Sequence, residues 1–79
     1  MRANRRLRVV HRRGGWAPTL VSPDRTDQVE VFEIETAETV FLWDVPAREV
    51  GGLMRELRAD LAGLEFEDFL AKWAAADER

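Results

Sequence analysis

Residues 29–61 read VEVFEIETAETVFLWDVPAREVGGLMRELRADL, and this stretch decides the fold. Residues 29–35 and 39–45 are rich in β-branched and aromatic side chains, and residues 36–38 between them form a connection short enough for a hairpin. Pro46 follows the second run, and proline is favoured at the first position of a helix, where the N–H that it lacks has no partner within the helix. The stretch therefore predicts a β-hairpin that leads directly into a helix.

The apolar positions of the first run change parity, from Val29 and Val31 to Phe32 and Ile34. Alternate residues of a strand share one face, so the change predicts either a β-bulge or partial burial of both faces. The pattern fits both alternatives.

Apolar residues at the spacing i, i+3, i+4, i+7 and i+11 predict that the helix after Pro46 buries one face. They are Val50, Leu53, Met54, Leu57 and Leu61. Gly63 suits the end of this helix, and a second helix is predicted over residues 65–75. Gly51 and Gly52 each weaken the first helix by about 1 kcal/mol relative to alanine, so we expect them to mark a site of close packing.

Residues 7–12 alternate apolar and basic side chains, which predicts a strand with His11 on its apolar side. A pair of glycines follows, and residues 16–21 are predicted as a return strand. The predicted fold is therefore α+β, with a small antiparallel β-meander of three to four strands followed by two C-terminal helices. We expect residues 1–79 to form one domain.

The 79 residues are 46% apolar and 34% charged, which is the balance of a globular protein rather than of a disordered tail. The absence of cysteine excludes a disulfide framework and a thiolate zinc site. No apolar run approaches the ~20 residues of a membrane span, so we expect a cytoplasmic protein without membrane contact. Residues 1–23 have no acid, as in an organellar transit peptide, but such peptides are serine-rich and this segment has only Ser22.

Charge is distributed unevenly along the chain. Residues 1–13 carry six arginines and no acid, a charge of +6, whereas residues 14–79 carry six basic and fifteen acidic residues, a charge of −9. The arginines at positions 6, 8 and 12 are expected on one face of the first strand, where such a row can contact nucleic-acid phosphates. The candidate contacts are Arg5, Arg6, Arg8, Arg12 and Arg13. Because the whole chain is acidic, internal pairing or solvation of these arginines is the favoured interpretation.

Candidate catalytic residues are few, because the chain has one histidine, one serine, and neither cysteine nor tyrosine. Ser22 and His11 are the only pair available for a nucleophile and its base, and a lone histidine on a strand is more often structural. Acid pairs such as Asp24 and Asp27 lack the spacing of a calcium loop and are interpreted as solvated. No glycine-rich phosphate loop is present. We therefore predict no enzyme activity, no cofactor and no metal.

Residues 40–43 put large apolar side chains on both faces of one strand, whereas two helices that follow the sheet can cover only one face. The predicted protein interface comprises Val40, Phe41, Leu42 and Trp43. Alternation places Phe41 and Trp43 on one face and Leu42 on the other. The sequence thus predicts a small non-enzymatic protein–protein interaction module, a homodimeric adaptor or regulatory subunit, whose partner is itself and/or another protein. The alternative is a nucleic-acid-binding accessory protein that uses the N-terminal arginines.

Overall fold

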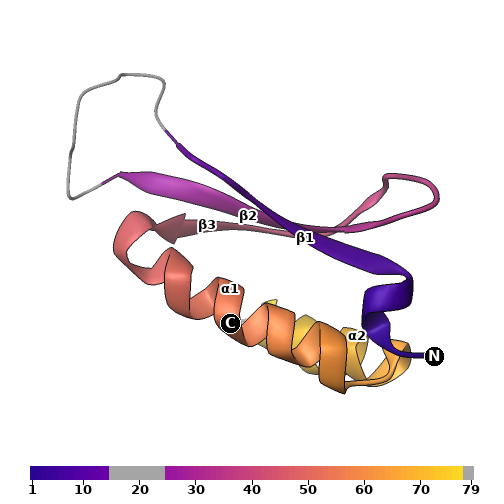
Figure 1. Cartoon of the computed structure of the whole chain (residues 1–79). Coiled ribbons are helices and arrows are strands. Elements are labelled where there is room, and N and C mark those ends of the chain that lie inside the picture. Colours follow the sequence, from indigo (N-terminus) through magenta and orange to yellow (C-terminus); the bar gives the residue numbers. More distant parts are fainter. Residues whose placement is uncertain (15–24, 78–79) are drawn as a thin grey trace.

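The computed structural model describes residues 1–14 and 25–77. The elements are a 3-10 helix η1 (Ala3–Arg5), strands β1 (Leu7–Arg12), β2 (Thr26–Glu33) and β3 (Thr39–Pro46), and helices α1 (Ala47–Gly63) and α2 (Phe66–Asp77). The strands form one antiparallel sheet in the order β1-β2-β3, and both helices lie against the same face of it (Figure 1). The predicted α+β fold is confirmed. The return strand predicted over residues 16–21 lies outside the described residues.

The hairpin between β2 and β3 contains a β-bulge. The register shifts between Val31 and Phe32, which leaves Val40 of β3 without a partner in β2. Both explanations for the parity change in this run hold: the register has a bulge, whose extra residue is in β3, and both faces of β2 are partly buried, since Glu30 on the face away from the helices is 7% exposed. In the turn that follows β2, Ala37 has a φ of 62°, a left-handed conformation in which a Cβ is unfavourable.

The core lies between the sheet and the helices. Its buried apolar residues are Ala3, Leu7, Val29, Val31, Phe41, Val45, Val50, Met54, Leu57, Leu61, Phe69 and Trp73. The predicted apolar stripe of α1 faces this core, with Leu53 partly buried beside it. Trp43 is also partly buried: its ring stacks on Phe41 at a centroid distance of 5.3 Å and meets the Trp73 ring at 5.6 Å. An aromatic cluster therefore joins β3 to α2.

Helix α1 begins at Ala47, one residue later than predicted, with Pro46 at the N-cap. Our expectation that Gly51 and Gly52 mark close packing is wrong, because a Cβ added at either position would meet nothing within 4 Å. Each glycine thus weakens α1 by about 1 kcal/mol relative to alanine, and no contact with a described residue compensates for it. No helix in the described part of the chain is both long enough and apolar enough to cross a membrane.

The N-terminal segment lies against the connection between α1 and α2. The Ala3 N–H donates to the Leu64 carbonyl at 3.0 Å, and the Phe66 N–H donates to the Met1 carbonyl at 2.9 Å. The first N–H groups of a helix have no partner within it, so this second bond satisfies one of them at the start of α2. The segment that precedes β1 thereby joins the sheet to the helical hairpin.

Candidate functional site

The face of the sheet turned away from the helices has no other described element against it (Figure 1). We call it the open sheet face. Its apolar residues are Val10, Phe32 and Leu42, with Val40 beside them at the bulge, and its charged residues are Arg8, Arg12, Glu30 and Asp44. Leu42 is 49% exposed and Val40 is 37% exposed. Aliphatic side chains therefore occupy a surface that also carries charges of both signs.

Charges on the open sheet face are ordered from one edge to the other. Arg12 of β1 approaches Glu30 of β2, with Nη1 2.7 Å from Oε1, and the Thr39 hydroxyl donates a hydrogen bond to the other Glu30 oxygen. On β3, Asp44 accepts a hydrogen bond of 3.3 Å from Gln28 Nε2. Arg12 and Glu30 offset each other's charge, so the remaining charges on this face are Arg8 on the β1 edge and Asp44 on the β3 edge.

The four residues of the predicted interface lie on opposite faces of β3, as alternation requires. Phe41 is buried in the core at 8% exposure, and Trp43 is partly buried beside it. Val40 and Leu42 are exposed. The interface stays a prediction, and these two are the members available at the surface.

The N-terminal arginines are divided among several surfaces. Arg6 lies 4.2 Å from the centre of the Phe66 ring and 3.2 Å from Glu33 Oε2, so the expected row of arginines 6, 8 and 12 is wrong for Arg6. The cause is that β1 begins only at Leu7, and the residue before it turns toward α2. Arg5 belongs to η1, and Arg13 is exposed beyond the end of β1. A nucleic-acid contact by all five arginines stays a prediction.

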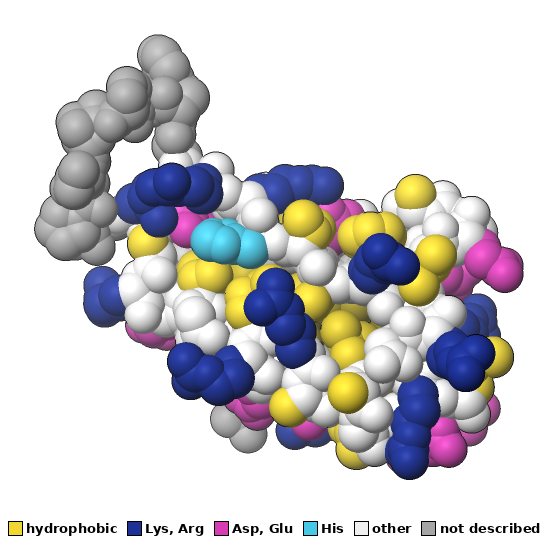
Figure 2. All heavy atoms as spheres, in the orientation of Figure 1, with side chains coloured by type: hydrophobic (Ala, Val, Ile, Leu, Met, Phe, Trp, Pro, Cys, Tyr) yellow, Lys and Arg dark blue, Asp and Glu magenta, His cyan; other side chains and the backbone are white. Residues whose placement is uncertain are grey.

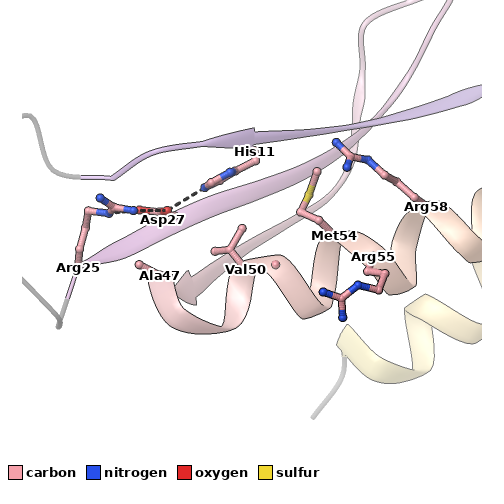
Figure 3. Close-up of a pocket in the computed structure, with 9 residues that line it drawn as sticks. His11, Arg25, Asp27, Ala47, Val50, Met54, Arg55 and Arg58 are labelled. Atoms are coloured by element: carbon pink, nitrogen blue, oxygen red, sulfur yellow. Dashed lines mark hydrogen bonds and ion pairs between the residues drawn. The ribbon is translucent and has the colours of Figure 1, made fainter.

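A second candidate site is an open groove of about 550 Å³ between the sheet and α1 (Figure 3). We call it the basic groove. Its lining residues are His11, Arg25 and Asp27 from the sheet side and Ala47, Val50, Gly51, Met54, Arg55 and Arg58 from α1. Figure 2 shows the chain's one histidine, in cyan, exposed on this side of the molecule with basic side chains in dark blue around it.

Asp27 organises one end of the basic groove, although its side chain is fully buried. Arg25 binds both carboxylate oxygens, with Nε 2.8 Å from Oδ1 and Nη2 3.1 Å from Oδ2. The Gly14 N–H donates to Oδ1 at 2.9 Å, and His11 Nε2 lies 2.7 Å from Oδ2. The Arg25 hydrogen bonds, then the Gly14 N–H, then His11 hold the pKa of Asp27 well below its ordinary value, although burial acts in the opposite direction.

The solvated interpretation of Asp27 is therefore wrong, whereas Asp24 lies outside the described residues. The signal that could have identified Asp27 is its position two and four residues before Val29 and Val31, on the buried face of the same strand. His11 was placed on the apolar side of β1, and the register puts it opposite Val29, close enough to reach Asp27. Ser22, the residue considered and disfavoured as its catalytic partner, lies outside the described residues.

Glycine is required at position 14 for a steric reason. A Cβ there would lie 1.6 Å from the Thr26 carbonyl oxygen, so only glycine lets the backbone come close enough to donate to Asp27. Within residues 1–14 and 25–77, no three His, Cys, Asp or Glu side chains gather as a metal site needs. What the groove offers chemically is hydrogen-bond donors and positive charge.

Comparison of the chain with protein-family models, with curated proteins and with solved structures finds no match. The open sheet face and the basic groove are therefore the features that bear on function.

Proposed function

We propose that this chain is a non-enzymatic protein–protein interaction module that forms a homodimer through its open sheet face. The observation that carries the proposal is the exposure of aliphatic side chains on that face, 49% for Leu42 and 37% for Val40. Ile34, in the turn after β2, is also 37% exposed. Neighbouring exposed apolar residues favour contact with another protein.

A second copy of the chain is the partner that fits the charges. The register puts Arg12, Gln28 and Asp44 in one row across the sheet. A two-fold axis parallel to the strands places β1 of one copy over β3 of the other, so Arg12 faces Asp44 of the second copy twice. In the neighbouring row, the same axis places Val10 over Leu42 of the second copy. Opposite charges thus meet in one row and aliphatic groups in the next, whereas Glu30 on the central strand, which is paired with Arg12 of its own chain, faces Glu30 of the second copy across the axis.

The size of the face sets the expected affinity. Three strands about 4.8 Å apart, with about 3.4 Å per residue along strands of eight residues, give a face of roughly 14 Å by 27 Å. This is about 380 Å² per copy and about 760 Å² for the pair, which is below the range of standard specific interfaces and within that of weak, transient contacts. We therefore expect a dimer that dissociates on dilution in the micromolar range.

Sedimentation velocity between about 1 and 200 µM tests the proposal, because mass action makes the dimer fraction depend on concentration. Leu42→Asp puts an unpaired charge into the aliphatic contact with Val10 of the second copy and is expected to weaken association at least about tenfold. Ala62→Asp adds the same charge at an exposed position of α1 and serves as the matched control. A single-chain mass for the unmodified protein at ~200 µM, or equal association of the two variants, would refute the homodimer.

Substitutions of Asp44 test the orientation of the two copies. Asp44→Asn removes an attraction to Arg12 of the second copy, whereas Asp44→Arg replaces it with a repulsion, so association should fall in that order. The nucleic-acid alternative has its own measurement. Binding of a single-stranded oligonucleotide that weakens steeply with salt, and that is lost in Arg8→Gln, would place that alternative first.

A further inference from the structure

We propose that the basic groove binds the phosphate group of a small phosphomonoester, with the organic part of the ligand against the apolar side chains of α1. The groove lies on the helix side of the sheet, so this inference goes beyond the dimer proposed above. The two sites are tested by different variants, and either can fail without the other.

The charge around the groove is the first argument. Arg55 and Arg58 have no acidic side chain within 4.0 Å among the described residues. They are three residues apart on α1, where like charges repel. In a chain with fifteen acidic and twelve basic residues, two neighbouring arginines without acidic partners point to an anion from outside the chain.

The sheet side of the groove supplies hydrogen-bond donors that a buried carboxylate holds in place. Asp27 is buried and accepts hydrogen bonds from Arg25 and Gly14, so it orients its neighbours rather than competing with them for a ligand. Its contact with His11 Nε2, which carries the proton that faces the carboxylate, holds the imidazole in place beside the groove. Figure 3 shows Arg58 reaching from α1 toward β1, with Arg25 beyond Asp27 at the other end. Guanidinium groups match phosphate oxygens in charge and in geometry.

The open space in the groove is the second argument. Gly51 lines the groove, and a Cβ at this position would meet nothing within 4 Å. Glycine inside a helix is destabilising, and no contact within the described residues requires it here. The volume of about 550 Å³ exceeds what inorganic phosphate fills and falls within the range of small-molecule sites. Val50 and Met54 provide apolar surface for the rest of such a ligand.

Isothermal titration calorimetry with phenyl phosphate in ~0.15 M NaCl tests the proposal, since screening at that salt suppresses weak surface binding. We expect saturable binding of one phenyl phosphate per chain, and weaker binding of inorganic phosphate. Arg58→Gln should weaken the binding of phenyl phosphate about tenfold, through the loss of a charged hydrogen-bond donor. Arg5→Gln removes the same charge from η1, outside the groove, and should leave the affinity unchanged.

A pair of glycine variants separates binding from stability. Gly51→Ala and Gly52→Ala both favour helix α1 and should both raise the melting temperature, but only Gly51→Ala puts a methyl group into the groove. The affinity for phenyl phosphate should therefore fall in Gly51→Ala and remain unchanged in Gly52→Ala. No saturable heat with the unmodified chain, or equal losses in Arg58→Gln and Arg5→Gln, overturns the site. If inorganic phosphate binds as tightly as phenyl phosphate, the proposed contact between the organic part of the ligand and the apolar side chains of α1 is wrong.

Discussion

Replacing Trp43 by alanine should destabilise the fold rather than the dimer. A fully buried tryptophan contributes about 3–5 kcal/mol relative to alanine, and a partly buried one about half of that. The contacts of its ring with Phe41 and Trp73 add about 1 kcal/mol. The expected loss is therefore about 3 kcal/mol, against a total of about 4–12 kcal/mol for a domain of this length. The melting temperature should fall by about 12–24 °C.

Thermal unfolding followed by circular dichroism, at a concentration where the chain is monomeric, measures this loss. The control is Leu42→Ala on the opposite face of β3, where a side chain that is 49% exposed contributes less than about 1 kcal/mol to the monomer. That variant should melt near the unmodified chain and yet associate more weakly. A Trp43→Ala variant that melts within about 4 °C of the unmodified chain would show that the aromatic cluster contributes less to the free energy of unfolding than calculated above.

Three further substitutions test the backbone and the buried carboxylate. Ala37→Gly should raise the free energy of unfolding by about 0.5–1 kcal/mol, because glycine adopts the left-handed φ of 62° without strain, and urea denaturation measures it. Gly14→Ala should lower it by about 1–3 kcal/mol, because the new Cβ would lie 1.6 Å from the Thr26 carbonyl oxygen, and a variant as stable as the parent would contradict that geometry. The pKa of Asp27 lies below its ordinary value of 3.8 in the fold, so the stability that it contributes is complete above about pH 4 and is lost as the pH falls further. The Asp27→Asn variant should therefore be less stable than the unmodified chain at neutral pH, and its stability should fall less as the pH is lowered. Melting curves of both proteins at several pH values measure this. An equal fall in melting temperature for the two proteins would contradict it.

The strands and helices after residue 25 were predictable because their signals are local. The β-branched run of β3, the proline before α1 and the apolar spacing of α1 each operate within a few residues. The bulge and the partial burial of both faces of β2 were foreseen as alternatives, and both occur, because they depend on how β2 pairs with β3 and on what covers it rather than on the local pattern. Gly51 and Gly52 misled the prediction because a helical glycine indicates either close packing or open space, and neighbours in space determine which.

The candidate sites depend on register, which the local pattern does not specify. Asp27 follows a stretch rich in turn residues, and its burial depends on donors from three separate positions, Gly14, Arg25 and His11. That arrangement exists only because β1 pairs with β2 in one register. Arg6 shows the same limit, since alternation along the sequence placed it with Arg8, whereas its contact with Phe66 depends on where α2 packs. The exposure of Leu42 was predictable, because it needed only the period of a strand and the number of helices.

The docking of the N-terminal segment on the helical hairpin has a consequence for synthesis of the protein. Arg2 Nη1 donates to the Gly63 carbonyl, 61 residues further along the chain. A ribosome adding about 5–20 residues per second needs about 3–12 s to make that interval. During this time the first strand can pair with β2, but the apolar underside of the nascent sheet has no helix to cover it. Slow translation of the α1 coding region would prolong that exposure, so the yield of folded protein should depend on the elongation rate there.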